Sequence, residues 1–355
     1  MTTLYDIAAP AKVNVFLHVV GRRPDGYHLL QTVFQFIDLA DTLHLEQRND
    51  GRITRRMDVP GVSEADDLTL RAARALQSAC GVRAGVDIGL VKRIPTGGGL
   101  GGGSSDAAST LIALNRLWGC GLSRAELMQL GLKLGADVPV FIFGRNAFAE
   151  GVGEQLTAVD LPESVYLIAQ PPVSVPTPEI FRAEDLTRDN LSIRITDFLA
   201  TPLARFGRND LERVACRLYP AVASGIELLS RSVRAAVAHQ RDQAGTTGAG
   251  SDPKGTTSCN LETEVPIVRM SGSGSCIFVQ CRNLDQAHAV EREVRKEVKQ
   301  EVLRESARGL GVKVQHIDKQ HATMQCGSRR DGVDFRLIQV CPGLSEHPLS
   351  SWIAN

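Results

Sequence analysis

The stretch from residue 94 to residue 109 contains six glycines in seven positions, at 97–99 and 101–103. Glycine has no side chain, so an anion can closely approach the backbone N–H groups of such a loop. A β-branched segment, Val86–Lys92, precedes the loop and predicts a strand. Apolar residues at helical spacing follow it (Ala107, Leu111 and Leu114). A glycine loop between a strand and a helix N-terminus predicts an anion site, and phosphate is the anion that such sites commonly bind.

Two familiar nucleotide loops do not fit this stretch. The glycines at 97, 99 and 102 satisfy the dinucleotide pattern G-x-G-x-x-G, but that fold needs an acidic residue about 20 positions later, after a second strand. That region instead holds Ser123 and Glu126, whose spacing predicts a capping box at the start of another helix. A P-loop requires a lysine after its last glycine, where this chain has Ser104.

The elements around the loop can be outlined from periodicity. Residues 11–20 alternate as a half-buried strand, and the pleat places four side chains on its other face, namely Lys12, Asn14, Phe16 and His18. Residues 29–46 predict further strands, and residues 65–79, 123–134 and 285–307 predict helices. Ser104 or Ser105 is expected to be the N-cap of the helix after the glycine loop.

Composition narrows the possible partners. The 355 residues include 40 basic and 40 acidic side chains, so no net charge favours nucleic acid or an anionic membrane as a partner. No apolar run is long enough to span a bilayer. The eight cysteines form no C-x-x-C pair and are expected to be reduced thiols. We assign no metal site to the loose spacing of His316, His321 and Cys326.

Three segments resemble the motifs of the GHMP kinases, the family of galactose, homoserine, mevalonate and phosphomevalonate kinases. Residues 95–105 read Pro-Thr-Gly-Gly-Gly-Leu-Gly-Gly-Gly-Ser-Ser and are similar to the second motif of that family. Residues 10–17, Pro-Ala-Lys-Val-Asn-Val-Phe-Leu, are similar to the first, and residues 270–278, Met-Ser-Gly-Ser-Gly-Ser-Cys-Ile-Phe, to the third. The resemblance covers about three-quarters of the chain, with the motifs in the family order.

The resemblance implies an α+β fold of two domains. Residues 1–170 would form the α/β domain with the glycine loop, and residues 171–318 a ferredoxin-like α/β domain after a proline-rich connector. Residues 239–263 are rich in polar residues and glycine and are expected to be a disordered insertion. Residues 319–355 have no counterpart in the family and receive no role.

The resemblance also implies roles for individual residues. Asp137, in the segment Gly-Ala-Asp-Val-Pro, would be the catalytic base, and Lys12 would hold it ionised. ATP would be the phosphoryl donor, and Mg²⁺ is expected with its phosphates, although no protein ligand can be named. The residues expected to bind ATP are Pro95, Thr96, Gly97, Gly98, Gly99, Leu100, Gly101, Gly102, Gly103, Ser104, Ser105, Asp67 and Lys92. At the position of Asp67 the family usually has an asparagine that contacts adenine, so this carboxylate is expected to relax the preference for ATP over GTP.

The sequence Asp-Gly-Tyr-His at residues 25–28 resembles a motif found in one branch of the family. The small-molecule substrate of that branch carries a cytidine diphosphate. In that branch an aromatic pair, here Tyr27 and Phe181, encloses the cytosine, and His28 forms hydrogen bonds with it. Asn14 and Thr177 are further expected substrate contacts.

Two alternatives stay open: a GHMP kinase for homoserine or a mevalonate, and a non-catalytic nucleotide-binding relative. Asp-Gly-Tyr-His argues against the first, and the presence of both Lys12 and Asp137 argues against the second. Only nine residues precede Pro10, which leaves no room for a plastid transit peptide and favours a bacterial cytoplasm. No pattern indicates an oligomeric state.

Overall fold

The computed structural model describes residues 2–59, 61–201, 206–247, 265–307 and 335–354. Its strands are β1 (Thr3–Arg22), β2 (His28–Arg48), β3 (Ile53–Arg55), β4 (Gly85–Val91), β5 (Ala147–Glu150), β6 (Gln155–Ala158), β7 (Val165–Gln170), β8 (Val268–Met270), β9 (Ile277–Cys281) and β10 (Leu337–Leu344). Its helices are α1 (Leu68–Cys80), α2 (Gly102–Leu117), α3 (Arg124–Leu132), α4 (Val138–Phe143), α5 (Thr177–Arg182), α6 (Ile195–Leu199), α7 (Glu212–Leu218), α8 (Pro220–Thr247) and α9 (Leu284–Ala307), with a 3₁₀ turn at Ser350–Trp352.

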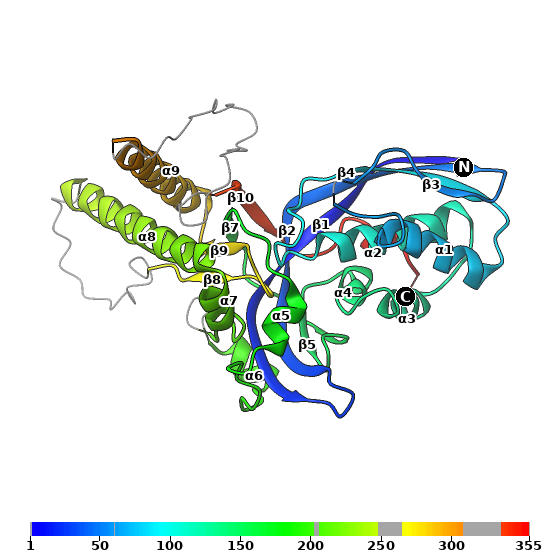
Figure 1. Cartoon of the computed structure of the whole chain (residues 1–355), viewed down its shortest axis with the longest axis horizontal. Coiled ribbons are helices and arrows are strands. Elements are labelled where there is room, and N and C mark those ends of the chain that lie inside the picture. The colour runs from blue at the N-terminus through cyan, green and yellow to red at the C-terminus, as the bar shows by residue number, and fades with distance from the viewer. Residues whose placement is uncertain (1, 60, 202–205, 248–264, 308–334, 355) are drawn as a thin grey trace.

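Among the described residues, the strands join into one hydrogen-bonded sheet that runs through both halves of the molecule (Figure 1). Its order is β3-β4-β2-β10-β7-β9-β8, with β1 and β5 also paired to β2, and β6 paired to β5. Only β3 and β4 pair in parallel among these strands. Helices α1–α4 pack on the first half, and α7–α9 pack on β7 and β9 in the second half. The expected α+β class is confirmed.

The long antiparallel ribbon of β1 and β2 carries the first motif. It includes the strand predicted over residues 11–20 but breaks its simple alternation, because the pairing register shifts between Asn14 and Leu17. Lys12 and Asn14 face the cleft described below, whereas Phe16 is buried in an apolar cluster with Val15. This register shift is a β-bulge. It separates Lys12 and Asn14 from Phe16, which the sequence predicted to lie on one continuous face of the strand.

The helix after the glycine loop begins earlier than expected. Its N-cap is Gly101, with a φ of +75°, and not Ser104 or Ser105, which both lie inside the helix. A Cβ at Gly101 would come within 3.0 Å of both the Lys12 side chain and the Phe141 ring. Glycine is therefore required here for its backbone conformation and for close packing, which explains why a serine does not cap the helix.

Two helices place Asp137 at the cleft. The predicted capping box of Ser123 and Glu126 is confirmed at the start of α3. Asp137 then forms the N-cap of α4, but its carboxylate accepts no capping hydrogen bond. Pro139 occupies the first turn of α4, where a missing N–H costs little. The carboxylate of Asp137 is thus left available for a contact outside its own helix.

The structure corrects where the predicted insertion after residue 239 begins. We expected disorder to begin at residue 239, but α8 continues to Thr247. His239 Nδ1 of α8 is 3.3 Å from Glu293 Oε1 of α9. The remaining residues of that expected insertion lie outside the described residues.

The last part of the chain, to which we assigned no role from the sequence, supplies β10 of the sheet between β2 and β7. The C-terminus then returns to the first half, near α3 (Figure 1), where Arg124 N–H donates to Ala354 O at 3.2 Å.

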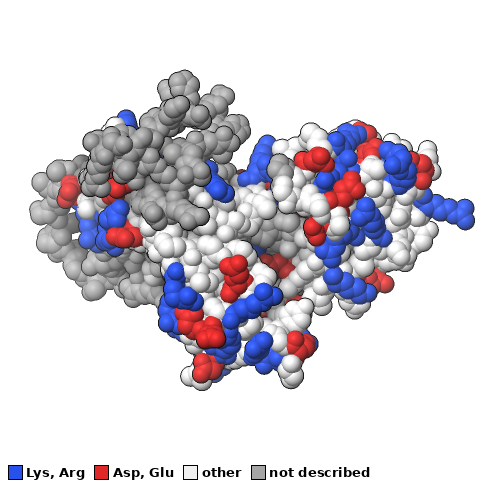
Figure 2. All heavy atoms as spheres, viewed as in Figure 1, with Lys and Arg blue, Asp and Glu red and all other residues white. Residues whose placement is uncertain are grey.

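The charged surface agrees with the neutral composition. Figure 2 shows basic and acidic side chains intermixed over the visible face. Among the described helices, none combines the length and the apolar character needed to cross a membrane. The described cysteines are free thiols (Cys80, Cys120, Cys216, Cys276, Cys281 and Cys341).

Candidate active site

A cleft with a volume of about 410 Å³ lies where the glycine loop meets β1, β2 and the loop between β8 and β9. Every predicted loop residue from Pro95 to Ser104 lines it, but Ser105 does not, because it is fully buried inside α2. Lys12, Asn14 and Asp137 line the cleft, as do Thr177 and Phe181. The structure therefore brings together residues that are more than 150 positions apart in the chain.

Lys12 is at the centre of the polar contacts in this cleft. Its side chain is 3% exposed, and its Nζ lies 3.1 Å from Asp137 Oδ2. Nζ also donates to Asn14 Oδ1 at 2.7 Å and to Gly99 O at 3.2 Å. Asn14 is fixed in turn, since its Nδ2 donates to Thr32 Oγ1 at 2.9 Å. A buried ammonium is thereby held between the glycine loop and a carboxylate that is 36% exposed to the cleft.

The glycine loop is locked against the loop of the third motif. Cys276 N–H donates to Gly98 O at 3.0 Å, and Ser271 Oγ donates to Gly99 O at 3.0 Å. A Cβ at Gly99 would lie 2.1 Å from Ser271 O, and the φ of Gly99 is +74°. The loop carbonyls are therefore used within the protein, a geometry that leaves N–H groups for a phosphate.

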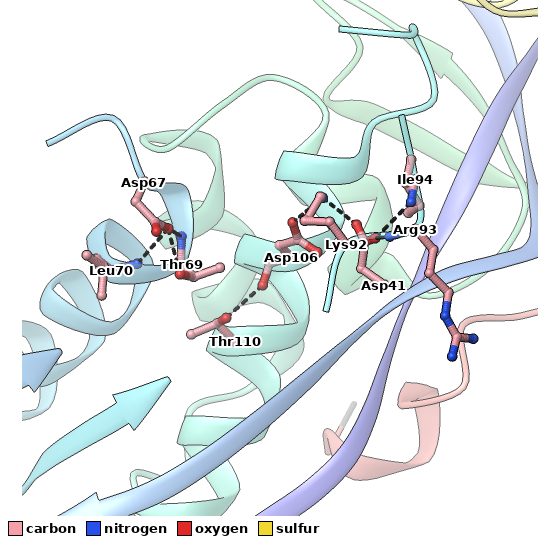
Figure 3. Close-up of polar contacts among 9 residues, drawn as sticks. All are labelled: Asp41, Asp67, Thr69, Leu70, Lys92, Arg93, Ile94, Asp106 and Thr110. Carbon is pink, nitrogen blue, oxygen red and sulfur yellow. Dashed lines mark hydrogen bonds and ion pairs between the residues drawn. The ribbon is translucent and has the colours of Figure 1, made fainter. Parts of the chain in front are cut away.

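Lys92 contacts two carboxylates that the sequence did not single out (Figure 3). Its Nζ pairs with Asp41 Oδ2 and, at 2.7 Å, with Asp106 Oδ2. Asp41 is fully buried, and its Oδ1 accepts from the N–H groups of Arg93 and Ile94 at the start of the glycine loop. Burial raises the pKa of the Asp106 carboxyl to about 8, despite the opposing effect of the ammonium of Lys92. Lys92 thus joins β2, the end of β4 and α2 next to the glycine loop.

Asp67 also lines the cleft, but its carboxylate is engaged in the protein (Figure 3). Oδ1 caps α1 by accepting from Thr69 N–H at 2.9 Å and from Leu70 N–H at 3.4 Å. Oδ2 lies 3.5 Å from Arg55 Nη1. The residue that we expected to contact the adenine therefore serves as the N-cap of a helix at the cleft wall.

Phe181, which lines the cleft, and His28, which packs against it, mark what we call the cytidine end of the cleft. The rings of His28 and Phe181 have centroids 4.9 Å apart, with an interplanar angle of 33°. Tyr27 is 63% exposed, and neither it nor His28 lines the cleft as the protein stands. Thr177 Oγ1 is 2.7 Å from Ser273 Oγ, which ties this end to the loop of the third motif.

Comparison with known proteins agrees with this geometry. Residues 67–145 match the model of the GHMP kinases N terminal domain. The chain is 52% identical over 354 residues to the 4-diphosphocytidyl-2-C-methyl-D-erythritol kinase of Bordetella bronchiseptica, which covers 99% of this chain and 100% of the relative. The chain belongs to the 4-diphosphocytidyl-2-C-methyl-D-erythritol kinases, a branch of the GHMP kinases.

A second relative and two solved structures support the same family and fold. The 4-diphosphocytidyl-2-C-methyl-D-erythritol kinase of Ralstonia pickettii is 50% identical to this chain over 295 residues, which are 83% of this chain and 91% of the relative. A crystal structure of a 4-(cytidine 5′-diphospho)-2C-methyl-D-erythritol kinase superposes with a TM-score of 0.62 at 35% identity, covering 81% of this chain and 94% of the other. A homoserine kinase from Cytophaga hutchinsonii, at 16% identity and a TM-score of 0.57, shares the fold. The α+β GHMP kinase fold expected from the motifs is thus confirmed.

Several residues that build the site of the kinase were missed by sequence reasoning. Asn209 Nδ2 donates to Met270 O at 2.8 Å and to Gly272 O at 2.7 Å, and so fixes the loop of the third motif. Asp106 directly follows the Ser-Ser pair of the glycine motif, and a carboxylate in the first turns of a predicted buried helix was the available signal. The signal for Asp41 was that a carboxylate interrupts the alternating apolar residues of a predicted strand.

Proposed function

We propose that this kinase transfers the γ-phosphoryl group of ATP to the 2-hydroxyl of 4-diphosphocytidyl-2-C-methyl-D-erythritol, in the non-mevalonate route to isoprenoid precursors. The observation that carries the proposal is the contact of Lys12 Nζ with Asp137 Oδ2 at 3.1 Å, next to the carbonyl of Gly99. A charge stabiliser and a base thus adjoin a phosphate loop in one cleft, which is what phosphoryl transfer to an alcohol requires.

The chemistry assigned to each group follows from its surroundings. Asp137 is the base that accepts the proton of the substrate hydroxyl, because its carboxylate is free of capping bonds and partly open to the cleft. Lys12, 3.1 Å from this carboxylate, compensates the negative charge that develops on the transferring oxygens. Asn14 and Gly99 O restrict the ammonium to one position, so little reorganisation is needed during the reaction.

Mg²⁺ would enter with ATP and neutralise charge on its phosphates. Among the described residues there is no group of three His, Cys, Asp or Glu side chains that could hold a metal. This fits an ion held largely by phosphate oxygens and water. Asp106 is the residue that would contact it, because it lines the cleft and carries a carboxylate beside Lys92.

The expected substrate end is formed by Tyr27, His28, Phe181 and Thr177. Phe181 and Thr177 line the cleft, and Tyr27 is free to close over a base, because 63% of its surface is exposed. We place the reaction in the cytoplasm of a bacterium, since the relatives are bacterial and both substrates are charged metabolites. The neutral composition supports a small-molecule partner rather than a nucleic acid or a membrane.

Parallel turnover assays test the proposal. ATP and Mg²⁺ are supplied with 4-diphosphocytidyl-2-C-methyl-D-erythritol, mevalonate or homoserine, and Asp137→Asn serves as the control for contaminating kinases. We expect product only from the cytidyl substrate. Equal or faster turnover of mevalonate or homoserine would contradict the proposed substrate, and ATP binding without turnover of any acceptor would favour a non-catalytic protein.

A further inference from the structure

Arg188 forms hydrogen bonds with both His28 and Phe181 at the cytidine end of the cleft. Its Nε donates to His28 Nε2 at 3.1 Å. Its Nη2 donates to Phe181 O at 3.0 Å and to Ala183 O at 2.6 Å, and its Nη1 donates to Leu186 O at 2.9 Å. One guanidinium thus holds the segment that follows Phe181 and, at the same time, one nitrogen of His28.

The contact with Arg188 determines where His28 carries its proton. A guanidinium has only N–H donors and stays protonated in proteins. His28 Nε2 must therefore accept with its lone pair, which leaves the proton of the neutral imidazole on Nδ1. The described part of the chain gives Nδ1 no hydrogen-bond partner, so this N–H is available to a ligand.

The surroundings of His28 keep the ring neutral. Burial lowers the pKa of His28, and the positive charges of Arg188 and Arg22 lower it further. A protonated ring would place a second N–H against the guanidinium, where it has no acceptor. The contact of the ring with Phe181, at 4.9 Å between centroids, fixes its plane as well. Orientation, charge state and tautomer are all set before a substrate binds.

We propose that Arg188 is a specificity-determining residue, which selects cytosine over uracil by holding His28 in the Nδ1–H tautomer. The pairing edge of cytosine offers acceptors at O2 and N3, and an Nδ1–H donor matches them. Uracil carries a proton at N3, so the same donor would face another donor there. This inference rests on the proposed function, which supplies the cytidine-bearing substrate. Arg188 is a positioning residue, because it acts on the base through His28.

Nuclear magnetic resonance of the free protein tests the first step without any substrate. Long-range ¹⁵N–¹H spectra report which imidazole nitrogen bears the proton, and His28→Gln assigns the signal. We expect the Nδ1–H form in the wild type and an increased share of the Nε2–H form in Arg188→Met. An Nε2–H form in the wild type would overturn the proposal, whether or not the proposed reaction is correct.

Kinetics test the second step, with the cytidine substrate and its uridine analogue compared in each variant. In Arg188→Met we expect the preference for cytidine, as a ratio of kcat/KM, to fall about tenfold or more. KM for the cytidine substrate should rise, while kcat and KM for ATP stay near the wild type. Arg217→Met is the matched control, because Arg217 anchors the same segment through Asp185 at 2.7 Å and makes no contact with His28. An unchanged preference in Arg188→Met, or an equal loss in Arg217→Met, would contradict the proposal.

A double-mutant cycle separates the tautomer from a general loosening of the segment. In a His28→Ala background, Arg188→Met should cause no further loss of preference for cytosine. Additive losses would mean that Arg188 acts independently of His28 and would overturn the inference. Should the wild type turn over neither nucleotide, the proposed function fails, while the tautomer measurement still decides the role of Arg188.

Discussion

The two ends of the cleft are built in different ways. At the phosphate end, Lys12 is 3% exposed and held by three polar partners, and the glycine loop is hydrogen-bonded to the third motif. At the cytidine end, Tyr27 is 63% exposed, and the fixed elements are His28 and Phe181, both bonded to Arg188. We infer that the phosphate end is preorganised by the fold, whereas the cytidine end is completed by its ligand.

This difference has a physical reason. Charge develops at the phosphate end during the reaction, and stabilising it is most effective when the dipoles are already in place. The base end only has to bind and orient, and an aromatic ring that closes over a base contributes about 1–3 kcal/mol through stacking. Substitutions at the phosphate end should therefore disturb both fold and catalysis, whereas those at the cytidine end should change substrate affinity alone.

The largest expected effect is that of Gly99→Ala. The new Cβ would lie 2.1 Å from Ser271 O in a backbone with a φ of +74°, so the loop and the third motif would be pushed apart. We expect kcat/KM for ATP to fall at least about 100-fold, together with a lower Tm. Gly89→Ala is the control, because Gly89 lies in β4 outside the cleft lining and its Cβ would meet nothing closer than His44 Cβ at 3.5 Å. Equal behaviour of the two variants would show that the interlock of the loops is unimportant.

Asp41→Ala tests whether the phosphate end depends on its buried anchor. The substitution leaves Lys92 with one carboxylate fewer and two loop N–H groups without their acceptor. We expect the free energy of unfolding to fall by about 3–5 kcal/mol, as measured by chemical denaturation. Asp160→Ala removes a carboxylate that is 95% exposed and pairs with Arg145 at the surface, so it should change stability by less than about 1 kcal/mol. A similarly small effect of Asp41→Ala would refute the anchor.

Tyr27→Ala should show the opposite behaviour at the cytidine end. The ring is largely exposed, so its loss should leave Tm unchanged. We expect KM for the cytidine substrate to rise by about 5- to 100-fold through lost stacking, with kcat little affected. A lower Tm with an unchanged KM would place Tyr27 in the framework and would remove the contrast between the two ends.

The sequence predicted the phosphate end better than the cytidine end. Glycines at 97, 99 and 101 adopt positive φ angles, so that part of the motif follows directly from backbone sterics. Arg188 could not be found in this way, because a lone arginine in a loop has no pattern until the fold places it beside His28. The position of β10 was also hidden, since a strand that pairs with partners about 170 and 300 residues away depends on tertiary context.

The smallest expected effect is that of Asp67→Asn. If residue 67 contacts the adenine, asparagine should shift the ratio of kcat/KM for ATP over GTP towards ATP. The capping contacts of Asp67 with Thr69 and Leu70 predict instead a change below about threefold, because asparagine caps a helix as well as aspartate does. The measured ratio decides between the two roles.

We propose that Lys12 and Asp137 act as one unit on one proton and one phosphoryl group. The most direct measurement is kcat with saturating ATP and cytidine substrate for Lys12→Ala, Asp137→Asn and the double variant. Asp137→Asn should lower kcat by about 10²- to 10⁴-fold through loss of the base. Because the two side chains are 3.1 Å apart and serve the same step, the double variant should be scarcely slower than the slower single variant. Fully additive losses, or a nearly normal kcat for Asp137→Asn, would contradict this account.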